Sequence, residues 1–246
     1  LEDEPEDGIK ETQEMVISPK DMPAKDWIKT RTFATLAEFY YFNKILQIPI
    51  ILINKLTKIK FSEIFQFLYS IRDDKNFPII TKVNKIFEDH SIGITEGGTV
   101  FLCSEKWHNM YWHPGEYAMI KLFENKELEQ FYNEAKFLIN SYVNKNYLSK
   151  YIEQSIEYNY LSLKKPFLKK NIIVNLDYDI PSDYKKALLD EFIEITPQKC
   201  AYQIEVDKDK KRDFLEWAKE VIWYGHRKAD YLYKSTQIKN LIYKKN

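Results

Sequence analysis

The sequence predicts a mainly α fold, with a helical body over residues 20–165 and a small α+β C-terminal subdomain over residues 170–246. Apolar residues recur at helical spacing from about residue 24 to residue 163. The period then changes to two in the stretches 172–180 and 202–207, which is typical of half-buried strands. Glycine is rare, at 6 of 246 residues, which disfavours a glycine-punctuated β-sandwich.

The helical body is expected to begin at Pro23, because proline suits the first position of a helix, where its missing N–H costs nothing. The run from residue 24 to about residue 48 is apolar on more than one face, which predicts a central helix that others cover. Pro49 is expected to kink or restart this helix. Further helices are predicted over residues 61–71, 78–89, 128–142 and 147–163.

The C-terminal subdomain is expected to alternate strands with helices. Residues 172–180 and 202–207 alternate apolar and polar side chains, as a strand with one buried face does. The segments 181–192 and 209–224 carry helical patterns. These assignments give a strand–helix–strand–helix order after the helical body.

The two ends of the chain differ in charge. Residues 1–14 carry seven acidic side chains against Lys10 alone, and the tail from Arg227 onward is basic. Residues 1–19 are interpreted as an acidic linker, and the chain as a piece of a longer protein. Over the whole sequence, 37 basic residues balance 37 acidic ones, so no nucleic-acid partner is expected.

Location and redox state follow from the apolar runs and the cysteines. The densest apolar run, residues 45–53, is too short to span a bilayer, so no membrane span is predicted. Cys103 and Cys200 do not make a disulfide scaffold, and a cytoplasmic location is expected. Cys103, His108 and His113 lack the short chelating spacing of a zinc finger, so no metal site is predicted.

The first group of candidate site residues lies in the aromatic stretch 107–117, WHNMYWHPGEY. Trp107, His108, Trp112 and His113 suit a partly exposed surface that binds a flat ligand or the upstream part of the protein. The alternative interpretation is a core plug, in which a loop caps the helical body. The sequence is compatible with both the exposed surface and the core plug.

The second group lies in the segment 217–237, WAKEVIWYGHRKADYLYKSTQ. Its aromatic residues are interpreted as a lock between the subdomain and the helical body. Its basic residues are interpreted as a cap at a helix C-terminus, where positive charge is favourable. The functional alternative is that Tyr224, His226 and Arg227 face a substrate, with the arginine suited to a phosphate or carboxylate.

Three stretches together carry a resemblance to a known family. SPKDMPAKDW (18–27), ILQIPIILI (45–53) and WAKEVIWYGHRKADYLYK (217–234) resemble the C-terminal region of cobalamin-binding radical SAM proteins. In that region a helix of the type aREvvWyGrrgGkyLY commonly closes the chain. The sequence departs from this pattern at Lys228, Ala229 and Asp230, where the family tends to have glycines.

The resemblance implies that an upstream cobalamin-binding domain and a radical SAM barrel belong to the same protein as this chain. A 4Fe-4S cluster, S-adenosylmethionine and cobalamin are then expected in the parent protein, which would be the enzyme. The barrel's C-x3-C-x2-C motif is absent here, so the chain is expected to hold no cofactor and to be inactive alone. Its expected role is an accessory domain on the substrate side. The alternative is an independent helical interaction module without catalytic activity.

Overall fold

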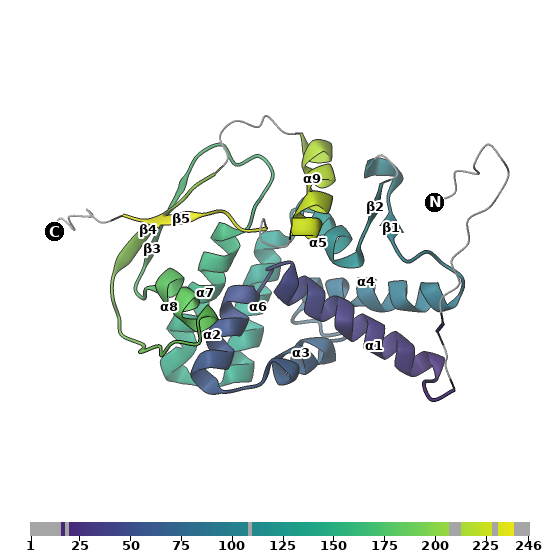
Figure 1. The fold of residues 1–246 in the computed structure, drawn as a ribbon, viewed down its shortest axis with the longest axis horizontal. Coiled ribbons are helices and arrows are strands. Elements are labelled where there is room, and N and C mark those ends of the chain that lie inside the picture. The colour runs from purple at the N-terminus through teal and green to yellow at the C-terminus, as the bar shows by residue number, and fades with distance from the viewer. Residues whose placement is uncertain (1–15, 18–19, 108–109, 207–212, 228–230, 239–246) are drawn as a thin grey trace.

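The computed structural model describes residues 16–17, 20–107, 110–206, 213–227 and 231–238, and for residues 223–227 it describes the backbone alone (Figure 1). Within these residues the fold is mainly α, with small antiparallel sheets of two and three strands, which confirms the predicted fold class. The helices are α1 (Ala24–Ala37), the π-helical turn η1 (Glu38–Phe42), α2 (Gln47–Thr57), α3 (Phe61–Ser70), α4 (Pro78–Thr95), η2 (Glu105–Trp107), α5 (Pro114–Glu124), α6 (Leu128–Val143), α7 (Asn146–Ser162), α8 (Ile180–Leu188) and α9 (Phe214–Arg227). The expected linker residues 1–15 and the tail from residue 239 lie outside the described residues.

The long apolar run at the start of the body forms two helices instead of one. The break falls at residues 43–46, and Pro49 lies in the first turn of α2, where a missing N–H leaves no helical hydrogen bond unmade. Asn159 of α7 holds this break. Its Oδ1 accepts from the backbone N–H of Ile48 at 3.0 Å, and its Nδ2 donates to the carbonyls of Lys44 and Ile45 at 2.9 Å each. Long-range side-chain contacts therefore set where the first helix ends.

A buried carboxylate fixes the next helix in the same way. Glu134 of α6 accepts hydrogen bonds from the backbone N–H groups of Ile79 and Ile80, at the first turn of α4. These N–H groups have no partner inside their own helix, and the helix dipole favours a negative charge there. The main apolar core draws side chains from α1 to α7 and from α9, and within it α1 packs along α4 (Figure 1).

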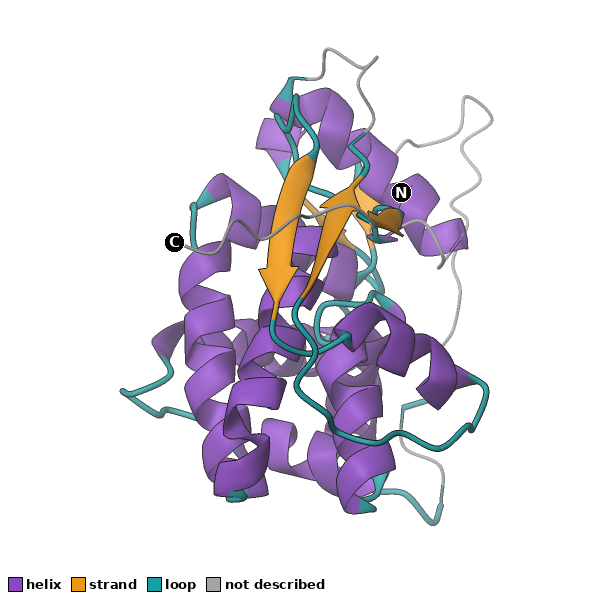
Figure 2. Ribbon diagram, turned by 90° about the vertical axis from the view of Figure 1, so that its left-hand side faces the viewer, coloured by secondary structure: helices purple, strands orange, loops and turns teal. Residues whose placement is uncertain are grey.

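The three-stranded sheet has the order β3 (Ile172–Leu176), β4 (Cys200–Ile204), β5 (Ser235–Gln237). Leu176 pairs with Cys200, and Tyr202 pairs with Gln237, in two antiparallel ladders. The first two strands were predicted from their alternation, whereas β5 was not, because its three residues lie in a basic tail. Figure 2 shows this sheet lying across the helices, and β3 packs on α7.

The last helix packs elsewhere. The two-stranded hairpin of β1 (Leu102–Cys103) and β2 (Tyr111–Trp112) leads into α5, and α9 packs against α5 above the body (Figure 1). The segment expected as one C-terminal subdomain therefore touches the helical body at two places. The sheet with α8 contacts α2 and α7, and α9 contacts α5.

No single helix in the described ranges is long and apolar enough to cross a bilayer. The segments Ala24–Phe42 and Gln47–Thr57 meet that criterion only when taken together, and they are bent by 93° at the break between them.

Candidate functional site: an ionisable row beside α1

The two predicted tryptophans are core residues. Trp107 and Trp112 are 1% and 0% exposed, and their rings meet edge to face at 5.4 Å. Trp112 Nε1 donates to the carbonyl of Ala218 in α9 at 3.3 Å, so the hairpin anchors the last helix. The prediction of an exposed aromatic surface is therefore wrong at these two positions. Both rings are buried against the helical body, as the core-plug interpretation predicts.

The other predicted residues are placed differently. His113 is exposed and precedes α5, where its backbone N–H donates to Glu116 Oε2 at 3.3 Å and its ring lies 5.0 Å from Phe101. His108 lies outside the described residues. Tyr224, His226 and Arg227 fall in the last turns of α9, but their side chains are outside the described part, so a substrate contact by them stays a prediction.

The structure gathers a different set of polar groups, which we name the ionisable row: His90, Arg31, Glu38, Tyr231 and Glu116. They come from α4, α1, η1, the chain after α9, and α5. Sequence reasoning missed four of them and treated Tyr231 only as an aromatic lock. The one signal available was the isolated acid inside two otherwise apolar runs, AEFYYF and PGEYAMI.

The row begins where α1 and α4 pack together. Thr32 Oγ1 donates to Ser91 Oγ at 3.1 Å, and the preceding residues on each helix are Arg31 and His90. His90 is 8% exposed, and its Nε2 lies 3.2 Å from the carbonyl oxygen of Thr99. In the part of the chain that the structure describes, His90 Nδ1 and Arg31 Nε are buried without a hydrogen-bond partner. Each such atom costs free energy of roughly 1–3 kcal/mol, so both positions call for an explanation beyond packing.

Two causes lower the pKa of His90. Burial disfavours the charged imidazolium, and the positive charge of Arg31 acts in the same direction. The ring is therefore neutral at neutral pH. If Nε2 carries the proton and donates to Thr99, then Nδ1 offers a lone pair. Burial also lowers the pKa of Arg31, and the charge of Glu38 partly offsets this effect.

The row continues to the chain after α9. Tyr231 is fully buried, and its pKa is raised first by burial and then by the negative charges of Glu116 and Glu38. The Tyr231 hydroxyl also donates to Glu116, which is itself buried in the first turn of α5. Backbone hydrogen bonds fix this position, because Lys164 N donates to Tyr231 O at 2.9 Å and Tyr233 N donates to Ser162 O at 2.7 Å.

These groups influence one another through their charges: Arg31 acts on His90, Glu38 acts on Arg31, and both Glu38 and Glu116 act on Tyr231. The row can bind a ligand that carries both hydrogen-bond donors and acceptors. Arg31 or Glu38 can then pair with an opposite charge on that ligand. Among the described residues no group of three or more His, Cys, Asp or Glu side chains is placed to hold a metal ion. Cys103 is exposed on β1 and Cys200 is buried on β4, so the two thiols lie on separate sheets.

No protein-family model matches this chain, and no curated protein matches it. The family resemblance of the three stretches therefore remains an expectation.

Proposed function

We propose that this chain is the C-terminal accessory domain of a cobalamin-binding radical SAM enzyme and lies on the substrate side of the barrel. One observation carries the proposal. Tyr231, which belongs to the third stretch of the resemblance, is buried in the ionisable row beside Glu38 and Glu116. The stretch that resembles the family thus contributes a residue to the ionisable row, and buried ionisable groups of this kind are typical of ligand-binding sites.

In this role the chain orients a polar substrate and the upstream domains of the same protein supply the chemistry. The 4Fe-4S cluster, S-adenosylmethionine and cobalamin belong to those domains. The residues of this chain do not fit the cluster, because three thiolates are needed and its two cysteines lie on different sheets. Arg31 suits a carboxylate or phosphate of the substrate, and Glu38 suits an amine or hydroxyl.

The test uses the full-length protein and compares two rates. Arg31→Gln and Glu38→Gln are expected to lower substrate turnover at least about tenfold, the loss of one charge-assisted hydrogen bond. Reductive cleavage of S-adenosylmethionine without substrate should stay unchanged, because the cluster lies elsewhere. Lys82→Gln serves as the control, since its ion pair with Glu127 at 2.8 Å lies outside the row. Equal loss of both rates, or of neither, would contradict the proposal.

A second candidate is the independent interaction module. The observation that favours it is a run of exposed apolar side chains at the end of α8 and just beyond it: Leu188, Leu189 and Phe192 are 56%, 71% and 82% exposed. The coding sequence upstream of Leu1 separates the two candidates. A C-x3-C-x2-C motif within a few hundred codons favours the radical SAM enzyme, and a start codon without such a motif favours the module.

A further inference from the structure

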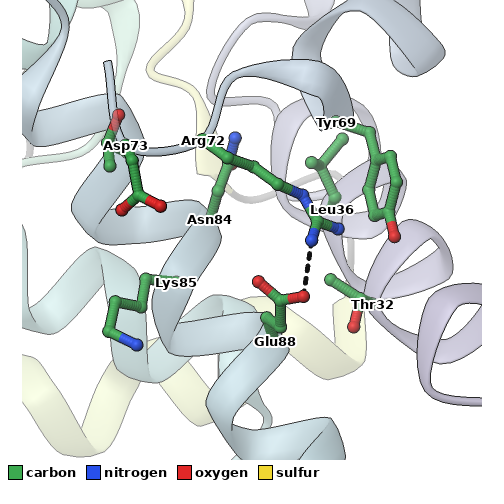
Figure 3. A pocket seen from close by; sticks show the side chains of 9 residues that line it. Thr32, Leu36, Tyr69, Arg72, Asp73, Asn84, Lys85 and Glu88 are labelled. Carbon is green, nitrogen blue, oxygen red and sulfur yellow. Dashed lines mark hydrogen bonds and ion pairs between the residues drawn. The ribbon is translucent and has the colours of Figure 1, made fainter. Parts of the chain in front are cut away.

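A second polar site lies between α1, the end of α3 and α4, and none of its lining residues belongs to the ionisable row. It is a pocket of about 130 Å³ lined by Thr32, Leu36, Tyr69, Arg72, Asp73, Thr81, Asn84, Lys85 and Glu88 (Figure 3). A cavity of about 150 Å³ in another protein binds a benzene molecule, so this pocket has room for a small organic ligand. A ligand of four to six non-hydrogen atoms fits this space.

Two charges of opposite sign form one wall. Arg72 Nη1 pairs with Glu88 Oε1 at 2.5 Å, and the guanidinium lies over the ring of Tyr69, 4.4 Å from its centroid. The stacking and the ion pair hold the guanidinium in one orientation, with the remaining N–H groups left for a ligand (Figure 3). This wall is preorganised for a planar anionic group such as a carboxylate.

The facing wall carries the opposite pair, Asp73 and Lys85 (Figure 3). Among the described residues, the Asp73 carboxylate has no hydrogen bond or ion pair. Its backbone has a φ of 51°, a left-handed conformation that Asp and Asn adopt more readily than most residues. Lys85 is exposed and pairs with Asp89 at 2.9 Å on its own helix. Asp73 is therefore the charge of this wall without a hydrogen-bond or ion-pair partner among the described residues, although its negative charge also acts on Lys85.

The neutral polar side chains of Asn84 and Thr32 in the lining are already engaged. Asn84 Oδ1 accepts from Tyr40 at 3.1 Å, and Asn84 Nδ2 donates to the carbonyls of Leu68 and Ile71 at 2.9 and 3.0 Å. Thr32 Oγ1 lies within hydrogen-bond distance of Ile28 O, at 2.8 Å, and of Ser91 Oγ, at 3.1 Å. Recognition in this pocket must therefore come from its charges, whose sum over Arg72, Lys85, Asp73 and Glu88 is zero.

We propose that this pocket binds a small zwitterion of the α-amino-acid class, independently of the function proposed above. The ligand carboxylate pairs with Arg72, and the ligand ammonium pairs with Asp73. A simple anion is disfavoured because Asp73 and Glu88 repel it, and a simple cation is disfavoured because Arg72 and Lys85 repel it. Only a molecule with both charges meets both walls.

The experiment is a titration of the 246-residue chain, followed by the backbone amide signals of residues 69–73 and 81–88 in ¹H–¹⁵N NMR spectra. The probes are glycine, L-alanine, acetate and methylamine. Glycine or L-alanine is expected to shift these signals saturably, with a Kd of about 10 mM or tighter, whereas acetate and methylamine bind at least about tenfold more weakly. Absence of saturable shifts with both amino acids overturns the proposal. Acetate binding as tightly as glycine overturns it as well, because the site is then an anion site.

Two variants and a control complete the test. Arg72→Gln and Asp73→Asn are each expected to weaken glycine binding at least about tenfold, since each removes one of the two charges. Asparagine tolerates the left-handed conformation, so Asp73→Asn remains informative if Arg72→Gln lowers the melting temperature. Lys82→Gln, on the same helix but paired with Glu127 outside the pocket, should bind glycine as the unmodified chain does. Unchanged affinity in Asp73→Asn overturns the proposed ammonium contact.

Discussion

Buried polar groups serve different ends at the α2–α7 junction and in the ionisable row. At the junction, both polar atoms of the Asn159 amide have partners, and the Tyr132 hydroxyl donates to Ile45 O at 2.6 Å. In the row, His90 Nδ1 and Arg31 Nε are buried without a hydrogen-bond partner in the described part of the chain. At the junction, the Asn159 amide and the Tyr132 hydroxyl have neutral partners, although Asn43 Oδ1 in the same break is buried without one among the described residues. The row instead brings ionisable groups together, and the two atoms that it leaves unsatisfied belong to ionisable side chains.

The difference separates two reasons for burying a polar group. A satisfied network costs little free energy and fixes one arrangement of the backbone, here the break between η1 and α2. An unsatisfied, ionisable group lowers the free energy of unfolding and persists where function requires it. Substitutions at the junction should therefore cost stability, and substitutions in the row should cost activity.

The largest effect on stability is expected in α9, the helix that precedes Tyr231 of the ionisable row. Trp217 of α9 is 1% exposed and packs edge to face on Phe123 at 4.6 Å. Trp217→Ala should lower the free energy of unfolding by about 3–5 kcal/mol, the usual cost of deleting a buried aromatic ring. Denaturation by urea, followed by circular dichroism, measures it. Phe192→Ala, at an 82% exposed position, is the control and should change the value by less than about 0.5 kcal/mol.

At the junction, Asn159→Leu should lower the free energy of unfolding by about 3 kcal/mol. The leucine leaves the Ile48 N–H and the carbonyls of Lys44 and Ile45 without their partner in a buried place. Asn133→Ala, at an exposed position of α6, is the matched control. A loss below about 1 kcal/mol would show that the break between η1 and α2 does not depend on this amide.

Lys165, beside the chain that follows α9, should make stability depend on pH. Its ammonium donates to the carbonyl of Tyr160 and lies over that ring, 3.9 Å from its centroid, and burial lowers its pKa to about 7. The unfolded chain, with a lysine pKa of about 10.4, binds more protons between these values, so stability rises with pH across that window.

The measurement compares the chain with Lys165→Met between pH 7 and pH 9, below the range in which tyrosines titrate. Between pH 7 and pH 9, the free energy of unfolding of the unmodified chain should rise by up to about 2 kcal/mol relative to that of Lys165→Met. Lys170→Met, at an exposed position, is the control, and its stability should depend on pH in the same way as that of the unmodified chain. A constant difference between the unmodified chain and Lys165→Met would mean that the Lys165 ammonium is solvated.

Local patterns explain why the fold class could be predicted and the row could not. The apolar spacing of residues 128–142 predicts α6 closely, and the alternation of residues 172–180 predicts β3, because each pattern reports which side of one element is buried. The restart of α2 depends on Asn159, more than a hundred residues away, and β5 exists because β4 offers a free edge. No local pattern contains such information.

The same limit applies to the site. Trp107 and Trp112 attract attention as large aromatics, yet large aromatics are also what a core needs, and both are buried. Glu38 and Glu116 are single acids on helices 78 positions apart, and only the fold brings both near Tyr231. An acid inside an apolar run is a usable signal, but its partners cannot be read from the sequence.

The smallest effect on stability is expected in the ionisable row itself. It tests most directly whether the row and the α2–α7 junction differ. His90→Leu removes the unpartnered Nδ1 together with the Nε2 contact to Thr99 O at 3.2 Å, so the gain and the loss offset and the free energy of unfolding should change by less than about 1 kcal/mol. Arg31→Met should raise the pKa of His90, because the positive charge that lowers it is gone, and the imidazole ¹H–¹³C NMR signals report this shift. Thr32→Val, which breaks the adjacent hydrogen bond to Ser91 without touching either charge, is the control and should leave that pKa in place. If His90→Leu instead costs as much as Asn159→Leu, the row is part of the architecture, and the division between the two regions fails.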